Sequence, residues 1–293
     1  MSDPLPTELR VAAIDACRAG AEVLRGYFRS GHLRVESKAE NDFVTQADRE
    51  SEAAVVAVLR ERFPSHRIVG EESLALAGGG PDEIQWLIDP LDGTTNFIQG
   101  LPIFSVSVGC RQGSRLLGAS IYDPIGENWW TAARGGGATW NGRAMRVSSR
   151  EGLAGSFLAT GYPFRARAAL DVYLACFREV FLQARAVRRC GSAAIDLANV
   201  AAGVYDGFFE FRLSPWDVAA GGLLVQEAGG VLIDLDGGDD WLAGGNVLAG
   251  SPGVVAGLRS ALGQHVDEAL IDRLVPVDPK MLAALGVTGA ATD

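Results

Sequence analysis

Three acidic clusters, far apart along the chain, constrain its fold most strongly, and neither histidine nor cysteine accompanies any of them. They are Gly70-Glu71-Glu72-Ser73, Asp89-Pro90-Leu91-Asp92-Gly93-Thr94-Thr95 and Trp216-Asp217. A site made of carboxylates, a hydroxyl and backbone groups suits a hard cation such as Mg²⁺ rather than zinc or copper. The glycine followed by two threonines offers backbone N–H groups to an anion. The clusters together predict phosphoryl chemistry assisted by metal ions.

Length and charge limit the other classes of function. A chain of 293 residues fits one large domain or two closely packed lobes. A net charge of −10 argues against direct nucleic-acid binding, because such surfaces are usually basic. No apolar run reaches the roughly 18 residues of a membrane span, and the first ten residues lack the features of a signal peptide. The four cysteines form no CxxC pair and read as buried free thiols, so we expect a cytoplasmic protein without a membrane partner.

Periodicity predicts a sheet-rich first half and an alternating second half. Helices are expected over residues 7–30, ending near Gly31, and over 45–63, followed by Pro64. Strands at 66–70, 84–88, 103–111, 115–122, 129–133 and 138–140 predict a mixed or antiparallel sheet. A lobe boundary is expected near 150–155. After it, strands alternate with helices, which predicts an α/β lobe. The strands are expected at 157–160, 184–188, 207–211, 231–235 and 246–249, and the helices at 167–181, 192–202, 215–228 and 253–262.

The domain prediction follows from this pattern. Residues 1–263 form one domain, with an N-lobe of about 1–154 and a C-lobe of about 155–263. Residues 264–293 are an appended segment of short helices at 265–274 and from 278, with Gly286 as a C-cap and a loose tail over 287–293.

The segment from Asp89 to Thr95 carries the strongest local signal. A strand ending at Asp89 leads into a Pro-containing turn, across which the carboxylates of Asp89 and Asp92 can converge. Leu91 can offer its carbonyl oxygen to a cation. Gly93 permits close approach of the backbone, and the two threonines open a short helix with free N–H groups. An ordinary turn of Asp, Pro and Gly explains the same letters, so both interpretations stand.

The other acidic residues each have a plainer explanation. Glu71 and Glu72 also suit a solvated loop after a strand. Asp217 suits a first-turn charge that complements the helix dipole. Asp48 completes a capping box with Thr45. Lys38 suits an exposed position as well as a phosphate contact. The histidines lie in unrelated contexts, which argues against a Ser-His-Asp hydrolase, and neither GxGxxG nor a Walker motif occurs.

In this order the clusters resemble those of the inositol monophosphatase family, the lithium-sensitive, Mg²⁺-dependent phosphatases. Weaker matches extend the resemblance over roughly residues 7–262. They are Asp42-Phe43-Val44-Thr45-Gln46-Ala47-Asp48, Thr160-Gly161-Tyr162-Pro163-Phe164-Arg165, Gly191-Ser192-Ala193-Ala194 and Glu227-Ala228-Gly229-Gly230. The third main cluster extends over Trp216-Asp217-Val218-Ala219-Ala220-Gly221. The resemblance implies an αβαβα layered sandwich, within the α/β (α+β) class.

The resemblance also implies two to three Mg²⁺ ions. One is held by Glu71, Asp89 and the Leu91 carbonyl. A second is held by Asp89, Asp92 and Asp217. A weaker third is held by Glu71, with Asp48 reached through water.

The same resemblance assigns the remaining site residues. The backbone N–H groups of Gly93 and Thr94, with the Thr94 hydroxyl, grip the phosphate. Glu71 and Thr94, with Asp48, orient the attacking water. The substrate's hydroxyl side is contacted by Glu210 and lined by Ala193, with Asp92 and Asp217 also facing the substrate.

The implied reaction is hydrolysis of myo-inositol monophosphate or a similar polyol phosphate. Histidinol phosphate, fructose 1,6-bisphosphate and 3′-phosphoadenosine 5′-phosphate are alternatives. Ser214 stands where animal members carry histidine, which affects substrate preference. A nucleotide would need an aromatic or basic shelf, which the sequence does not place. The family also suggests a homodimer, and an interaction with the transcription machinery is a hypothesis of another class.

Overall fold

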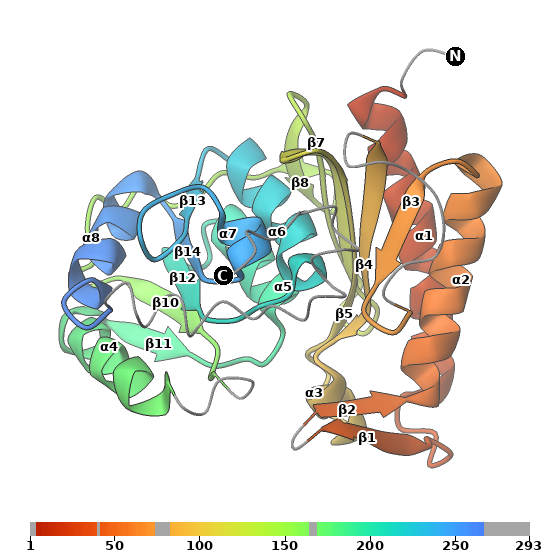
Figure 1. Cartoon of the computed structure of the whole chain (residues 1–293), viewed down its shortest axis with the longest axis horizontal. Coiled ribbons are helices and arrows are strands. Elements are labelled where there is room, and N and C mark those ends of the chain that lie inside the picture. Colours follow the sequence, from red (N-terminus) through yellow and green to blue (C-terminus); the bar gives the residue numbers. More distant parts are fainter. Residues whose placement is uncertain (1–3, 40–41, 74–82, 164–168, 267–293) are drawn as a thin grey trace, which may run out of the picture.

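Five layers of helix and sheet stack side by side in the computed structural model (Figure 1). The structure describes residues 4–39, 42–73, 83–163 and 169–266, without the side chains of residues 37–39 and 42. From right to left in Figure 1, the layers are an outer helix pair, a seven-stranded sheet, an inner helix pair, a five-stranded sheet and a second outer pair. This order confirms the αβαβα sandwich.

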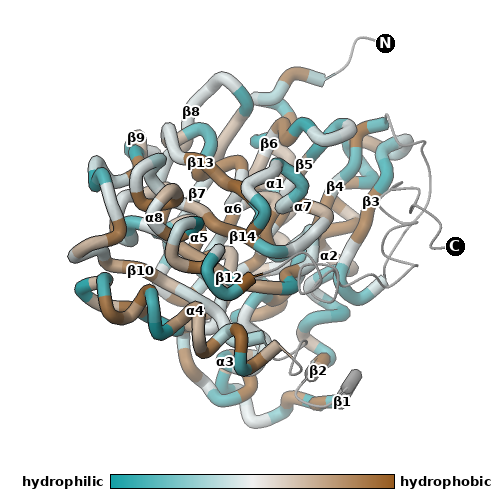
Figure 2. The backbone as a smooth tube through the Cα atoms, turned by 60° about the vertical axis from the view of Figure 1, so that its left-hand side comes forward, coloured by the Kyte–Doolittle hydropathy of each residue, from teal (hydrophilic) through white to brown (hydrophobic). Residues whose placement is uncertain are grey.

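The helices of these layers differ in how they are buried. The outer pairs are α1 (Pro6–Tyr27) with α2 (Gln46–Arg62), and α4 (Leu170–Gln183) with α8 (Pro252–Leu262). The inner pair is α5 (Ala193–Ala201) and α6 (Pro215–Glu227). Every residue of α6 from Pro215 to Val225 is buried, as expected for a helix covered by sheets on both sides. Hydrophobic residues accordingly colour much of the middle of the molecule brown in Figure 2.

The seven-stranded sheet confirms the mixed sheet predicted for the first half. Its order is β3-β4-β5-β6-β7-β8-β9, with β3 and β4 parallel and the other neighbours antiparallel. The strands are β3 (Arg67–Gly70), β4 (Ile84–Asp92), β5 (Ser105–Gln112), β6 (Arg115–Asp123), β7 (Asn128–Ala133), β8 (Gly137–Trp140) and β9 (Arg143–Ala144).

The five-stranded sheet combines parallel and antiparallel pairs. Its order is β11-β10-β12-β14-β13, in which β10 is parallel to β11 and β12, while β14 is antiparallel to β12 and β13. The strands are β10 (Phe157–Thr160), β11 (Ala186–Arg188), β12 (Gly207–Glu210), β13 (Val231–Ile233) and β14 (Val247–Gly250). The two sheets lie on either side of residues 150–155 in the sequence, whereas the division into domains stays a prediction.

Small residues allow the layers to approach closely. A side chain at Gly118 on β6 would place its Cβ 2.8 Å from the backbone nitrogen of Arg10 on α1. On the other face of the sheet, a Cβ at Gly109 on β5 would lie 2.8 Å from the Cβ of Ala219 on α6. Both distances are shorter than a carbon contact permits, so glycine sets the spacing of helix and sheet at these positions.

Two predicted boundaries were wrong. The first helix ends at Tyr27 rather than near residue 30, because Phe28 turns into extended backbone and packs its ring on Phe97 and Phe104, with centroid distances of 5.5 and 4.9 Å. The strand predicted to end at Asp89 continues through Pro90 to Asp92. Its register against β5 shifts between Asp89 and Asp92, and a bulge of this kind tolerates a proline.

Some short elements were not predicted, and some predictions lie outside the described residues. The hairpin of β1 (Val35–Ala39) and β2 (Asp42–Thr45), the two-residue strand β9 and the short helix α7 (Trp241–Gly244) were missed. The side chain of Lys38 and the appended helices and tail beyond residue 266 are not described. Cys17, Cys110 and Cys176 are buried free thiols, as expected, and Cys190 is half-buried. In the described ranges, every helix is too short or too polar to span a bilayer.

Candidate functional site

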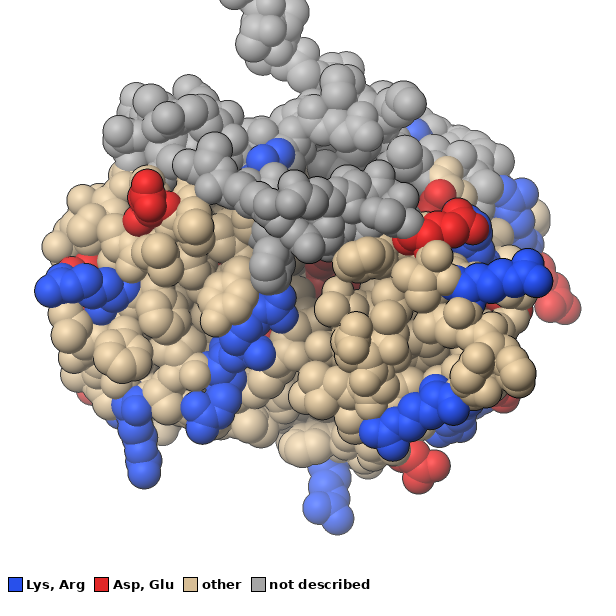
Figure 3. Space-filling view, turned by 90° about the horizontal axis from the view of Figure 1, so that it is seen from below, with Lys and Arg blue, Asp and Glu red and all other residues tan. Residues whose placement is uncertain are grey.

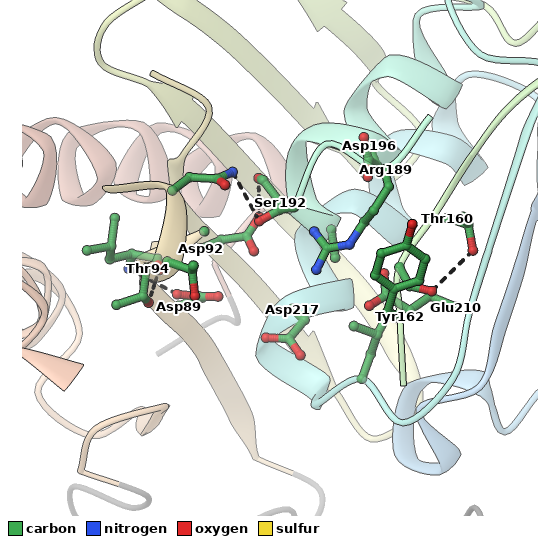
Figure 4. Close-up of a pocket in the computed structure, with 18 of the residues that line it drawn as sticks. Asp89, Asp92, Thr94, Thr160, Tyr162, Arg189, Ser192, Asp196, Glu210 and Asp217 are labelled. Carbon is green, nitrogen blue, oxygen red and sulfur yellow. Dashed lines mark hydrogen bonds between the residues drawn. The ribbon is translucent and has the colours of Figure 1, made fainter. Parts of the chain in front are cut away.

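A pocket of about 730 Å³ lies between the two sheets and collects all three acidic clusters (Figure 4). One wall comes from the ends of β3 and β4 and from α3 (Thr94–Ile98). The opposite wall comes from the segments after β10, β11 and β12 and from the first turns of α5 and α6. Among its lining residues are Glu71, Asp89, Leu91, Asp92, Gly93, Thr94, Ala193, Glu210 and Asp217.

The bulged end of β4 directs its carboxylates into this pocket. The backbone N–H of Leu91 donates to Oδ1 of Asp89 over 2.9 Å, so the aspartate is fixed by its own strand. The Pro90 carbonyl accepts a hydrogen bond from Ser51 of α2 over 2.9 Å. Asp89 and Asp92 are 2% and 8% exposed. The two carboxylates therefore share one cavity, as the sequence predicted, on a strand end rather than an isolated turn.

Gly93 forms the turn between β4 and α3. Its φ is 96°, in the left-handed region that glycine tolerates best. A Cβ at this position would lie 2.9 Å from the carbonyl oxygen of Ile103 and 3.3 Å from that of Gly191. The short helix predicted after Gly93 is present, and its first residues line the pocket.

Thr94 connects this turn to α2. Its hydroxyl lies 3.0 Å from the Leu91 carbonyl and 3.3 Å from Oδ1 of Asp48. Oδ2 of Asp48 accepts hydrogen bonds from the backbone N–H and the hydroxyl of Thr45, at 2.8 and 2.5 Å. The capping box predicted for Asp48 is thus present, and the same carboxylate also reaches the site.

Glu71, Asp89 and Asp217 form the acidic centre of the pocket. One carboxylate oxygen of each lies within 4.8 Å of the others. Glu71 follows β3 and donates its N–H to Ile88 over 3.1 Å. Asp217 accepts from the backbone N–H of Ser214 over 2.7 Å, so it caps α6 while facing the other carboxylates. The geometry of Asp217 therefore agrees both with a charge in the first turn of a helix and with a carboxylate that faces the pocket.

Asp92 lines the same pocket but lies outside this three-carboxylate group. Its Oδ2 accepts hydrogen bonds from the Ser192 hydroxyl and, over 2.8 Å, from the backbone N–H of Ala194. Ser192 also caps α5 by accepting from Ile195. Asp92 therefore joins the bulged strand to the first turn of α5, and its predicted part in a second metal site stays a prediction.

Burial and mutual repulsion shift the titration of these carboxyl groups. Desolvation raises the pKa of Asp89 well above its usual range, and the charges of Glu71, Asp92 and Asp217 raise it further. Burial raises the pKa of Asp92 to about 6, against the hydrogen bonds from Ser192 and Ala194. A divalent cation would remove this repulsion, and an all-oxygen donor set fits a hard cation such as Mg²⁺.

The predicted substrate residues lie across the pocket from the acidic centre. Ala193 is the first residue of α5, and Glu210 ends β12. The carboxylate of Glu210 lies against Gly161, where a Cβ would come within 1.8 Å of Oε1. Gly161 must therefore remain glycine for Glu210 to keep its position.

Sequence reasoning assigned no role to five further lining residues, namely Tyr162, Arg189, Ser192, Asp196 and Arg212. Tyr162 and Ser192 stand in segments that carried the resemblance, which was the available signal. The guanidinium carbon of Arg189 lies 5.3 Å from the ring centroid of Tyr162. The sequence alone placed no aromatic or basic group beside the pocket that could support a nucleotide. The structure corrects this, because Tyr162 and Arg189 both line the pocket.

Comparison with known proteins extends over nearly the whole chain. A family model described as the inositol monophosphatase family matches residues 5–270. The Nus factor SuhB of Pseudomonas aeruginosa is 44% identical over 265 residues, covering 89% of this chain and 98% of that protein.

Solved structures show the same similarity. The extragenic suppressor protein suhB from Bartonella henselae has a TM-score of 0.82 at 38% identity, covering 87% of this chain and 98% of that one. The inositol monophosphatase from Anabaena has a TM-score of 0.79 at 38% identity, covering 90% and 98%.

Proposed function

The chain belongs to the inositol monophosphatase family, and from that membership and its acidic pocket we propose an Mg²⁺-dependent hydrolase of small polyol or sugar phosphates, with myo-inositol 1-phosphate as the first substrate to test. One observation supports this most strongly. Glu71, Asp89 and Asp217 converge within 4.8 Å in the pocket that the Gly93–Thr94 turn also lines. Carboxylates suited to a cation thus lie beside backbone N–H groups suited to a phosphate.

We propose that these residues hold two to three Mg²⁺ ions, and the oxygen-only donor set of Glu71, Asp89 and Asp217 supports this. Glu71, Asp89 and the Leu91 carbonyl would hold one ion, and Asp89, Asp92 and Asp217 a second. The third would be held by Glu71 with Asp48. Bound Mg²⁺ supplies neutralisation of the phosphate dianion and lowers the pKa of water.

The protein's own groups would position the reactants. The Thr94 hydroxyl, held at 3.3 Å from Asp48, would orient the attacking water and pass its proton toward that carboxylate, and Glu71 would help to orient the same water. The Gly93 and Thr94 N–H groups would hold the phosphate. Glu210 and the start of α5 at Ala193 would contact the hydroxyl groups of the leaving alcohol.

The direct test is phosphate release from myo-inositol 1-phosphate with Mg²⁺, with EDTA, and with Mg²⁺ plus Li⁺. Turnover that requires Mg²⁺ and falls with Li⁺ is expected. Histidinol phosphate, fructose 1,6-bisphosphate and 3′-phosphoadenosine 5′-phosphate complete the panel, and relative kcat/KM ranks them. Absence of turnover on all four compounds would overturn the proposed activity.

A second function is supported by the names of the relatives. Proteins 44% identical to this chain, from Pseudomonas aeruginosa and Escherichia coli, are called Nus factor SuhB. We propose that this chain also associates with the transcription machinery. Affinity capture with purified RNA polymerase and Nus proteins, using wild type and Asp217→Asn, tests this. Equal capture by both forms would show that the association does not depend on catalysis. Absence of capture by either form would refute the association.

We also propose a homodimer in the cytoplasm. The family membership supports it, and so do the exposed apolar side chains of α4. Leu170, Leu174, Phe181 and Leu182 are 48%, 51%, 63% and 63% exposed. Exposed apolar groups gathered on one helix are typical of a protein interface. Light scattering that gives only the monomer mass would contradict the proposed dimer.

A further inference from the structure

Three buried polar side chains of α2 contact the segments that carry the acidic clusters. The helix packs on the outer face of the seven-stranded sheet (Figure 1). Asp48, Ser51 and Glu52 are 1%, 0% and 4% exposed. Asp48 lies 3.3 Å from the hydroxyl of Thr94, and Ser51 donates to the carbonyl of Pro90 over 2.9 Å. Two of the three side chains therefore contact the bulged end of β4 and the turn that follows it.

Glu52, the third of these side chains, contacts the segment that follows β3. Its Oε2 accepts a hydrogen bond from the backbone N–H of Glu72 over 3.0 Å. The preceding N–H, that of Glu71, donates to the carbonyl of Ile88 on β4 over 3.1 Å. The peptide groups before and after the Cα of Glu71 are therefore both anchored, one to β4 and the other to α2. Because the backbone on both sides of a Cα sets the direction of its Cβ, these two hydrogen bonds direct the side chain of Glu71.

Gly70 at the end of β3 leaves the space that the Glu52 carboxylate occupies. A Cβ at Gly70 would lie 2.2 Å from Oε2 and 2.6 Å from Cδ of Glu52, and these are its nearest neighbours. The φ of Gly70 is not positive, so its backbone conformation does not by itself require glycine. The carboxylate of Glu52 is therefore the group that excludes a side chain at this position.

The burial of Glu52 is costly for the stability of the fold. Figure 3 shows Asp and Glu side chains at the surface of one face of the molecule, several of them close to Lys or Arg side chains. Glu52 instead lies on a helix face whose other members, Ala47, Val55 and Leu59, belong to an apolar cluster between the outer helices and the sheet. A carboxylate in such a place costs free energy that hydrogen bonds must offset. This cost indicates a role for Glu52 in the site rather than in the stability of α2.

We propose that Glu52 is a positioning residue for Mg²⁺, because its hydrogen bond to the backbone of Glu72 directs the carboxylate of Glu71 into the pocket. The inference rests on the proposed function, in which Glu71 is a ligand of Mg²⁺. Glu52 does not line the pocket, so it would act on the cation only through the segment that it holds. Groups that orient a metal ligand from behind typically change metal affinity by about 10- to 100-fold when they are removed.

The test is calorimetric titration of Mg²⁺ onto wild type, Glu52→Ala and Glu52→Gln. Glu52→Ala leaves the N–H of Glu72 without this acceptor, and the Kd for Mg²⁺ should rise by about tenfold or more. Glu52→Gln keeps an oxygen that can accept the same hydrogen bond, so its Kd should stay close to the wild-type value. Equal losses in both variants would show that the charge of Glu52 matters rather than its hydrogen bond, and would overturn the positioning role.

Val55→Ala is the control for damage to the helix. Val55 lies three residues after Glu52, faces the same core and is 0% exposed. The substitution leaves a cavity, so the urea midpoint of unfolding should fall while the Kd for Mg²⁺ stays at the wild-type value. If Val55→Ala weakened Mg²⁺ binding as much as Glu52→Ala does, general loosening of α2 would explain both results, and the proposal would be wrong.

Gly70→Ala approaches the same contact from the opposite side. Its Cβ would displace the carboxylate of Glu52, so the Kd for Mg²⁺ should rise in this variant as well. In the Glu52→Ala background the carboxylate is already gone, and adding Gly70→Ala should cost little further affinity. Residues in direct contact show such non-additive effects. Losses that multiply in the double variant would show that Gly70 and Glu52 act separately, which would contradict the proposal.

Failure of the proposed function would give a different result. If wild type binds Mg²⁺ but hydrolyses none of the phosphate esters, the activity is refuted, while the order of Kd values among the variants still decides the role of Glu52. If wild type is active and Glu52→Ala binds Mg²⁺ as tightly as wild type, the positioning role alone is refuted. A wild type that binds no Mg²⁺ would overturn both.

Discussion

The hydroxyl of Thr94 lies 3.3 Å from Oδ1 of Asp48, which joins the Gly93–Thr94 turn to the first turn of α2. The two residues are 46 positions apart in the sequence. Oδ2 of the same carboxylate accepts from Thr45, so Asp48 is fixed by the cap of its helix while its other oxygen faces Thr94. This geometry suits a pair that handles one proton.

A double-mutant cycle tests whether Asp48 and Thr94 act as a unit. Thr94→Ala and Asp48→Asn should each lower kcat by about 100-fold, in the range of general acid–base catalysis. The double variant should be little worse than the more damaging single variant, because residues that act together lose their effect together. Steady-state kinetics at saturating Mg²⁺ measures this. Losses that multiply in the double variant would show that the residues act separately.

Asp92→Asn should fold and lose nearly all turnover. The amide oxygen can still accept from Ser192 and Ala194, whereas the charge needed by a cation is gone. We expect kcat to fall by at least about 100-fold, the scale of losing one preorganised electrostatic contact. Circular dichroism checks the fold. Wild-type turnover of Asp92→Asn at saturating Mg²⁺ would contradict the two-ion assignment.

Asp123→Asn provides the control for that substitution. Asp123 is equally buried, at 8% exposed, and accepts from the backbone N–H groups of Ile125 and Gly126 in the β6–β7 turn. It does not line the pocket. Its removal should reduce stability while turnover per folded molecule stays at the wild-type value.

Local signals predicted the carboxylate-bearing wall of the pocket at the end of β4. Asp89, Gly93 and Thr94 lie within a few residues of each other, so their sequence spacing already limits how their groups can be arranged. The continuation of β4 through Pro90 was missed, because proline usually ends a strand and the bulge depends on pairing with β5. The β1–β2 hairpin was missed because its strands are short and polar.

The opposite wall could not be derived from spacing. Tyr162 and Arg189 meet through contact between segments 27 residues apart, and neither has a local pattern that marks a site. The position of Arg189 depends on Gly191 and on the ring of Tyr162, which Tyr173 supports. Such contacts follow from the packing of β10, β11 and α4, and single-sequence reasoning does not specify that packing.

The pH dependence of stability should reveal the carboxyl groups of the pocket. Asp92 in the folded chain holds its proton to a pKa of about 6, compared with the ordinary 3.8. Between these values the folded state binds more protons than the unfolded state, so stability falls as pH rises. For Asp92 alone the fall in the free energy of unfolding is roughly 3 kcal/mol, and Asp89 extends it to higher pH. Urea unfolding in EDTA from pH 4 to 7 measures it.

Two additions separate the pocket from other buried carboxyl groups. Saturating Mg²⁺ should abolish the pocket's share of the fall, because the cation favours the ionised groups. Asp92→Asn should flatten the curve in EDTA. Asp234, 6% exposed and with its pKa also raised to about 6 by burial, lies outside the pocket lining. The part of the fall in the free energy of unfolding that Asp234 causes should disappear in Asp234→Asn but remain in wild type with Mg²⁺. A metal-free stability that rises with pH would contradict these assignments.

Alanine substitutions at two glycines with positive φ separate the cost of backbone strain from the effect of disturbing the site. Gly113 in the β5–β6 turn has a φ of 57° and no atom within 4 Å of a Cβ placed there. Gly113→Ala should therefore cost only the conformational strain, about 1 kcal/mol, and keep its activity. Gly93→Ala meets a larger strain, because a φ of 96° lies beyond the left-handed region that alanine can occupy, and its Cβ would also lie 2.9 Å from the Ile103 carbonyl. The turn must shift, and Thr94 must move with it.

We expect Gly93→Ala to lose more stability than Gly113→Ala and about 100-fold in kcat/KM, since a displacement near 1 Å of positioning groups has that effect. Urea unfolding and steady-state kinetics on both variants make the comparison. Equal activity of the two variants would show that the site does not depend on the close approach at Gly93. A loss of activity confined to Gly93→Ala would show that the site depends on the close approach at Gly93, because both substitutions share the same change of side chain and the same sign of φ.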